Sequence, residues 1–199
     1  MGSGTATTLT VNADSTDGGA NADTTETISI GAIGTADEIG AVTLDAADGI
    51  TFTGDITLAD AAGADLDIDG KVFISGNVTI DTDNTTGGGT DDGTINFSST
   101  IDGVTEGTPI ADNLVIKAGG SGGGSLTITG NIGDEVALTT LKINATAGNL
   151  AFTVPQIGGG GSVGVTGNVD LGNTGSGDIT FSGTTAVSYT HLTLPTISD

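Results

Sequence analysis

Residues 42–80 have the sequence VTLDAADGITFTGDITLADAAGADLDIDGKVFISGNVTI. This stretch contains six triplets in which two apolar residues flank a middle residue that is usually Thr or Asp. The triplets are Val42-Thr43-Leu44, Ile50-Thr51-Phe52, Ile56-Thr57-Leu58, Leu66-Asp67-Ile68, Val72-Phe73-Ile74 and Val78-Thr79-Ile80. Alternation with a period of two is typical of a β-strand with one buried and one solvated face. The stretch therefore predicts six short strands.

The triplets fall into two sets of three. The second set starts at positions 66, 72 and 78, which is 24, 22 and 22 residues after the first set at 42, 50 and 56. Three strands that recur about every 22 residues predict an all-β, three-sided β-solenoid, a parallel β-helix whose rungs have about 22 residues. Corners are expected at Gly54-Asp55, Gly76-Asn77, Gly130-Asn131 and Gly167-Asn168, since glycine tolerates a positive φ.

A longer echo supports a repetitive architecture. Ile33-Gly34 returns as Ile132-Gly133, and Val42-Thr43-Leu44 returns as Leu141-Lys142-Ile143, at shifts of 97 to 100 residues over the whole echo. Strand-and-turn spacing alone also fits a string of β-sandwich modules, which is the structural alternative. The Gly-rich stretches 86–94, 119–125 and 158–164 are interpreted as loops that leave the rungs, and flexible linkers are the equal alternative.

Composition sets limits on function. The 199 residues include 36 Gly, 3% aromatic residues and no Cys, and the net charge is −22 with three Lys as the only Lys or Arg. Such a chain is repelled by nucleic acids and by anionic membrane surfaces. It lacks an apolar stretch long enough to span a bilayer, so no membrane insertion is expected. It also lacks a signal peptide, which would have to lie outside this sequence. The acidic side chains favour cations, and calcium above all.

Asp65, Asp67 and Asp69, followed by Gly70, match the opening of a calcium-binding loop, where acids at positions 1, 3 and 5 converge on the ion. Position 12 of such a loop is normally Glu, and here it is Gly76. The alternative interpretation is a strand whose Asp side chains point outward. Calcium is thus a possible cofactor of this segment, and a plain strand is the competing hypothesis.

Asp81, Asp83, Asp91 and Asp92 bracket a Gly-rich stretch and form a second candidate calcium site. Calcium-binding nonapeptide repeats need tandem Gly-Gly-x-Gly-x-Asp, which this stretch does not supply. The alternative is a solvated acidic loop.

The residues favour no catalytic class. Phosphate loops require Gly-Lys-Ser/Thr, which is missing, and the single His191 offers no credible base for a nucleophile triad. β-Helix polysaccharide-active enzymes generally place a basic residue beside their acids, and three scattered Lys make this a remote alternative. We therefore expect no catalysis.

Three phrases resemble the strand repeats of very large bacterial surface proteins of the filamentous-haemagglutinin and autotransporter-adhesin type. They are Gly177-Asp178-Ile179-Thr180-Phe181-Ser182-Gly183, Leu126-Thr127-Ile128-Thr129-Gly130-Asn131-Ile132 and Leu141-Lys142-Ile143-Asn144-Ala145. The resemblance covers residues 5–187. It implies a right-handed β-helix, export, and a role as a stalk or adhesive fibre, and it brings no catalytic residues. The chain then looks like an interior fragment of a longer protein.

The two ends differ from this repeat region. Residues 1–4 (MGSG) are interpreted as an artificial leader. Residues 188–199 form a non-repeat tail, and its stretch 188–196 (SYTHLTLPT) resembles a translated sequencing adapter at the end of a metagenomic gene. The alternative for the tail is a terminal strand at 192–194.

Three functional hypotheses follow. The first is a structural or adhesive segment of an extracellular bacterial surface protein. The second is a calcium-dependent surface-layer or matrix module, and the third is a β-helix polysaccharide-active enzyme. Expected partners are further copies of the chain, joined end to end at unpaired strand edges, and a host or matrix glycan or protein. Nucleic acid is not an expected partner.

Overall fold

The computed structural model describes residues 7–13, 26–34, 39–59, 61–82, 93–105, 111–118, 124–145, 152–159, 164–173 and 179–181. This part of the chain forms 16 strands and contains no helix. No helix long and apolar enough to cross a membrane is found within it. The leader, the tail and most of the three Gly-rich stretches lie outside the described residues.

The strands form three sheets, and every pair of neighbouring strands is parallel. Sheet A contains β1 (Leu9–Asn12), β3 (Val42–Asp45), β6 (Leu66–Asp69), β9 (Ile95–Phe97), β12 (Leu126–Ile128), β14 (Phe152–Val154) and β16 (Ile179–Phe181). Sheet B contains β2 (Thr27–Ile30), β4 (Gly49–Phe52), β7 (Val72–Ile74) and β10 (Ile101–Gly103). Sheet C contains β5 (Ile56–Thr57), β8 (Asn77–Asp81), β11 (Asn113–Lys117), β13 (Thr140–Ala145) and β15 (Val169–Asn173).

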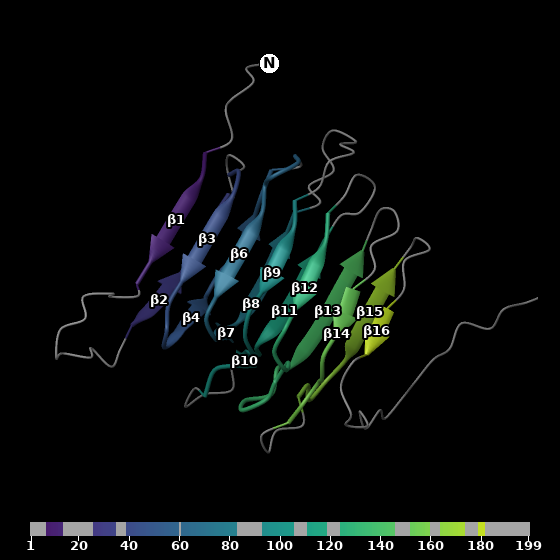
Figure 1. The fold of residues 1–199 in the computed structure, drawn as a ribbon. Helices are drawn as coiled ribbons and strands as arrows, with labels where there is room; N and C mark the ends of the chain where they lie inside the picture. Colours follow the sequence, from purple (N-terminus) through teal and green to yellow (C-terminus); the bar gives the residue numbers. More distant parts are fainter. Residues whose placement is uncertain are drawn as a thin grey trace, which may run out of the picture.

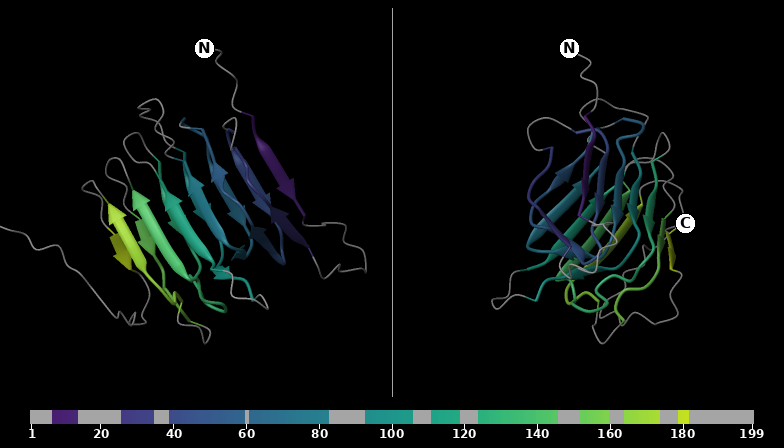
Figure 2. Two further views of the ribbon diagram at one scale, coloured as in Figure 1. Left: turned by 180° about the vertical axis from the view of Figure 1, so that it is seen from behind. Right: turned by 60° about the vertical axis from the view of Figure 1, so that its left-hand side comes forward.

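The chain visits the sheets in a fixed order. From β3 to β11 it passes through sheets A, B and C three times in succession, and we call one such passage a rung. After β10, isolated bridges from Ile101 to Ile132 and from Ile132 to Ile157 continue the pairing beside sheet B. Figures 1 and 2 show the rungs stacked in sequence order along one direction. The prediction of an all-β, parallel architecture is confirmed, and the arrangement is compatible with a parallel β-helix. Sandwich modules would instead require antiparallel sheets, and none of the described strand pairs is antiparallel.

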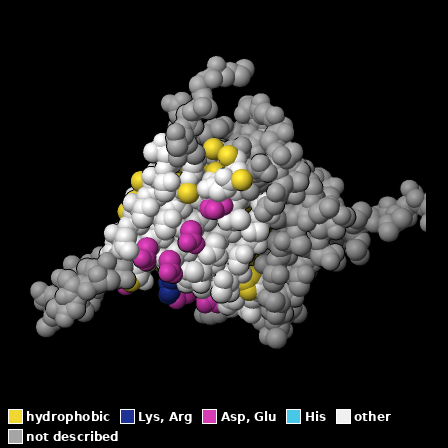
Figure 3. Space-filling view, turned by 45° about the horizontal axis from the view of Figure 1, so that its top comes forward, with side chains coloured by type: hydrophobic (Ala, Val, Ile, Leu, Met, Phe, Trp, Pro, Cys, Tyr) yellow, Lys and Arg dark blue, Asp and Glu magenta, His cyan; other side chains and the backbone are white. Residues whose placement is uncertain are grey.

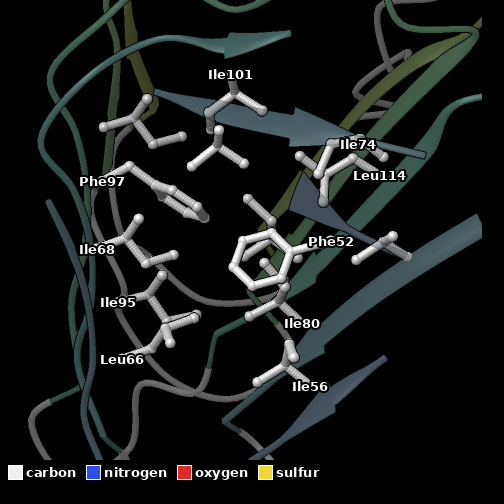
Figure 4. Close-up of a cluster of buried hydrophobic side chains, with 14 of the residues drawn as sticks. Phe52, Ile56, Leu66, Ile68, Ile74, Ile80, Ile95, Phe97, Ile101 and Leu114 are labelled. Carbon is white, nitrogen blue, oxygen red and sulfur yellow. The ribbon is translucent and has the colours of Figure 1, made fainter. Parts of the chain in front are cut away.

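The apolar residues of the triplets form one continuous core between the sheets. Figure 4 shows side chains from all three sheets pointing toward one another, among them Phe52 of β4, Leu66 of β6 and Leu114 of β11. Each of these three side chains is fully buried. Because each triplet contributes two inward residues per strand, thin layers of Ile, Leu and Val fill the interior, and the fully buried Phe among the residues of described burial are Phe52 and Phe97. This explains how a chain so poor in aromatic residues builds a core.

Rung length varies more than the triplet spacing predicts. Thr27 pairs with Gly49, a step of 22 residues, whereas Asn77 pairs with Asn113, a step of 36 residues. Within the quoted stretch, Ile56 pairs with Ile80 and not with Val78. The predicted step of 22 residues is therefore wrong at this place, and the true step is 24. A shift of two residues keeps the same side chains inward, so the triplet pattern is unable to exclude it.

The longer echo does not correspond to a structural repeat. Val42 lies on β3 in sheet A, whereas its counterpart Leu141 lies on β13 in sheet C. The two copies thus occupy different sides of the stack. The likeness arises because strands on every side obey the same rule, with apolar residues inward and polar residues outward.

The corner glycines serve two different purposes. Gly76 has a φ of 86°, a conformation that other residues rarely adopt. Gly54 does not have a positive φ, but a Cβ at this position would lie 2.7 Å from the backbone nitrogen of Ala32 in the adjacent rung. The prediction of a positive φ is therefore confirmed at Gly76 and wrong at Gly54, Gly130 and Gly167, where close approach of a neighbouring backbone excludes a side chain.

Candidate functional site

The first predicted calcium segment is a strand. Leu66 and Ile68 of β6 are fully buried, so Asp65, Asp67 and Asp69 lie on the opposite, outer face. Alternate residues of a strand are about 6.6 Å apart. The three carboxylates therefore form a row along the strand and do not converge on one point, as the ligands of a calcium loop do.

Each carboxylate of this row accepts hydrogen bonds from the next rung. Asp65 Oδ1 accepts from the backbone N–H of Thr94 at 2.7 Å and from its hydroxyl at 2.9 Å. The two other bonds join Asn96 Nδ2 to Asp67 Oδ1 and Ser98 Oγ to Asp69 Oδ1, both at 2.8 Å. The row thus acts as a set of acceptors that links two adjacent rungs.

The second predicted calcium site is described at one residue only. Asp81 Oδ2 lies 3.0 Å from Lys117 Nζ, which belongs to the neighbouring strand of sheet C. Asp83, Asp91 and Asp92 lie outside the described residues, so a calcium site there stays a prediction. Among the residues that the structure describes, no group of three or more His, Cys, Asp or Glu is placed to hold a metal ion.

A similar ladder of polar side chains runs along the outer face of sheet C. Asn113 Nδ2 donates to Asn77 Oδ1, and the Thr140 hydroxyl donates to Asn113 Oδ1, each at 2.6 Å. The three residues are in register on β8, β11 and β13. This ladder was not predicted from the sequence because the three residues are 36 and 27 positions apart. Their common position, at the first residue of each strand, was the available signal.

The most deeply placed carboxylate near sheet C is that of Asp112, which is 4% exposed. Its Oδ1 accepts from the backbone N–H of Gly76 at 3.1 Å, and its Oδ2 accepts from that of Val104 at 3.0 Å. Its own N–H donates to the Thr139 hydroxyl at 3.1 Å. Gly76, Asp112 and Thr139 precede successive strands of sheet C, so Asp112 connects three rungs at a single corner, to one neighbour through its side chain and to the other through its backbone N–H.

A second buried carboxylate lies on sheet B. Asp102 is fully buried, and its Oδ1 accepts from the backbone N–H groups of Glu135 and Val136 at 2.8 and 3.3 Å. It thereby holds the backbone of Glu135 and Val136 against the outward side of β10. Asp102 was not predicted as a buried residue because the middle residue of a triplet is expected to face water, and the sequence does not reveal that Glu135 and Val136 bind its carboxylate.

The outer surface is mostly uncharged in the view of Figure 3, with separate acidic side chains and a single patch of Lys or Arg colour. The described ion pairs join Lys71 to Glu135, Lys117 to Asp81 and Lys142 to Asp170. Each of the three Lys residues of the chain thus contacts an acid.

Comparisons with protein-family models, with curated proteins and with solved structures found no match.

Proposed function

We propose that this chain is a structural repeat segment, a stalk or fibre, of a secreted bacterial surface protein, and that it folds as a right-handed parallel β-helix without catalytic activity. The observation that carries the proposal is the use of the outer polar side chains. On sheets A and C they bond to the next rung, as Asp67 does with Asn96 and Asn77 with Asn113. A surface whose polar groups bind one another supports stacking and leaves few groups to act on a substrate.

The proposed mechanism is mechanical. Parallel ladders and the apolar core join each rung to its neighbours, and a stack of this kind transmits force along its length while holding a distal region away from the cell. The net charge of −22 keeps neighbouring molecules apart in solution. The extracellular location and the bacterial source are parts of the proposal and rest on the resemblance to adhesin repeats.

The test is a binding and turnover assay on the purified chain. A passive stalk should show no saturable binding to immobilised matrix proteins or to a glycan array, and it should release no new reducing ends from acidic polysaccharides. Saturable binding to one of these ligands would assign the adhesive role to this segment itself. Steady release of reducing ends would overturn the proposal in favour of the β-helix polysaccharide enzyme.

One pair of neighbouring acids favours the second hypothesis, the calcium-dependent surface-layer or matrix module. Asp45 of β3 is in register with Asp69 of β6, and like charges directly opposite each other destabilise a strand pair. The two acids are flanked by polar donors, since Asn12 Nδ2 donates to Asp45 at 2.8 Å and Ser98 Oγ donates to Asp69 at 2.8 Å. A cation between them would relieve the repulsion.

For a passive stalk, we expect the melting temperature in millimolar calcium to stay within about 2 °C of that in excess chelator. Ligands that bind only the folded state raise stability in proportion to the logarithm of their concentration. Circular dichroism measures the transition, with sodium chloride added to equal ionic strength because salt alone screens a charge of −22. A rise of many degrees that is lost in Asp45→Asn would establish the calcium-dependent module.

We also expect the purified chain to associate end to end. β1 has a paired neighbour on one side only within the described part of the chain, and its inward residues Leu9 and Val11 are only partly buried. Strand edges of this kind pair with other chains. Sedimentation velocity should show oligomers that grow with concentration. Val11→Lys should reduce them, whereas Thr10→Lys, on the outer face of the same strand, should have less effect. A monomer at every concentration would contradict the prediction.

A further inference from the structure

Two buried oxygen atoms on sheet B have no hydrogen-bond partner. They are Thr100 Oγ1 and Asp102 Oδ2. Thr100 directly precedes β10, and its carbonyl oxygen accepts from the N–H of Val72 at 2.9 Å, so the extended backbone reaches back to it. Because the intervening Ile101 is fully buried in the core, Thr100 and Asp102 both point away from the core on the same side. An unpaired buried hydroxyl and an unpaired buried carboxylate oxygen are both costly, and their occurrence two residues apart on one face calls for a common cause.

Residues 131–136 are held beside β10 and Asp102 by several hydrogen bonds. Ile101 N–H donates to Asn131 O at 3.0 Å, and Gly103 N–H donates to Val136 O at 2.9 Å. Asp102 Oδ1 binds the N–H groups of Glu135 and Val136. Residues 131–133 therefore continue sheet B beside β10, residues 135 and 136 bind the outward carboxylate of Asp102, and both unpaired oxygens are buried.

The nearest charged pair does not satisfy them. Lys71 Nζ lies 3.2 Å from Glu135 Oε1, and both side chains are about half exposed, at 45% and 60%. Lys71 therefore bonds at the surface, and not to Asp102. The carboxylate of Asp102 keeps one oxygen that needs a donor, and the hydroxyl of Thr100 keeps a hydrogen that needs an acceptor.

We propose that one internal water molecule binds here, bridging Thr100 Oγ1 and Asp102 Oδ2 beside residues 135 and 136. Water is the one small ligand that satisfies both atoms at once, because it accepts from the hydroxyl and donates to the carboxylate. At a tetrahedral water, two hydrogen bonds of about 2.8 Å join oxygens about 4.6 Å apart, a separation that two side chains can reach from Cα atoms about 6.6 Å apart by leaning toward each other. A divalent cation suits the site poorly, since calcium takes six to eight oxygen ligands.

With the bridging water, Thr100→Val should lower the stability of the fold, whereas removing a buried hydroxyl without a partner should raise it. Val has nearly the same shape as Thr but lacks the hydroxyl. If Thr100 Oγ1 had no partner, its removal would stabilise the fold, because an unsatisfied polar atom would be lost. If a water is bound, Thr100→Val removes one of its partners, and the unfolding equilibrium constant should rise about fivefold. Thr82 is the matched control, since its Oγ1 is also buried without a partner but belongs to no such pair.

The experiment is urea unfolding of Thr100→Val, Thr100→Ser and Thr82→Val, together with a high-resolution crystal structure of the unmodified chain. The proposal expects Thr100→Val to be less stable than Thr100→Ser, which keeps the hydroxyl, while Thr82→Val is at least as stable as the unmodified chain. It also expects one density peak within about 3 Å of both oxygens. A Thr100→Val variant as stable as the unmodified chain would overturn it. So would a crystal structure with no peak, or with a peak surrounded by six or more oxygens at calcium distances, and the structure decides the matter even if a variant does not fold.

Discussion

Phe52→Ala should lower the free energy of unfolding by about 3–5 kcal/mol, the usual cost of truncating a fully buried Phe. Phe52 is 0% exposed and lies at the centre of the side chains in Figure 4. The truncation leaves a cavity. The Ile and Leu neighbours of Phe52 in adjacent rungs are held in parallel ladders, so they have little freedom to close it. Urea denaturation followed by circular dichroism measures the change, with a constant m-value as the sign that the unfolded state is unaltered.

Phe73→Ala is the matched control for this prediction. Phe73 is the middle residue of its triplet on β7, and it is only half-buried on the outer face, where its ring covers Gly49. The same truncation should therefore cost much less there, because the apolar area returned to water is smaller and no closed cavity forms. Equal losses at positions 52 and 73 would contradict the inward and outward assignment of the triplets.

Asp112→Ala should lower the free energy of unfolding by roughly 3 kcal/mol. It removes the acceptor of two backbone N–H groups, those of Gly76 and Val104, and an orphaned buried donor costs about 1–3 kcal/mol. The stability of Asp112→Asn should lie between that of the unmodified chain and that of Asp112→Ala. The amide keeps one acceptor oxygen, but it presents a donor to the other N–H group. The same urea titrations give all three values.

Asp55→Ala provides the control for a carboxylate near the surface. Asp55 Oδ1 accepts from a single backbone N–H, that of Thr79, at 2.7 Å, and the contact is exposed. Water replaces the lost acceptor there, so the loss should be clearly smaller than at Asp112. If Asp55→Ala and Asp112→Ala were equally destabilising, burial would not be the source of the effect at the corner.

The triplets were sufficient to predict the strands and their faces, but not their partners. Ile56 pairs with Ile80, and Leu141 lies on a different sheet from Val42. The alternation of apolar and polar residues fixes which side chains are buried. It is unchanged when the pairing between two strands shifts by two residues, and it is the same in all three sheets. The pairing depends on the lengths of the connecting segments, which the apolar pattern does not encode.

The candidate sites show the same limit. The spacing of Asp65, Asp67 and Asp69 fits a calcium loop and a strand equally well, and the burial of Leu66 and Ile68 decides for the strand. Asp102 and Asp112 were not predicted because acids are rarely buried and their donors are backbone groups from other rungs. Such donors have no sequence signature.

The variable rung length makes the corners tolerant of insertion. The step from Asn77 to Asn113 is 12 residues longer than the step from Ile56 to Ile80, 36 against 24, yet β8 and β11 pair over their full length. Lengthening a connection costs only the logarithm of its size. At the corner between β10 and β11, Asp112 closes the base of the connection by binding Val104. Foreign peptides grafted between these two residues would be displayed at a fixed point of the stack, which makes the fold a scaffold for spaced epitopes.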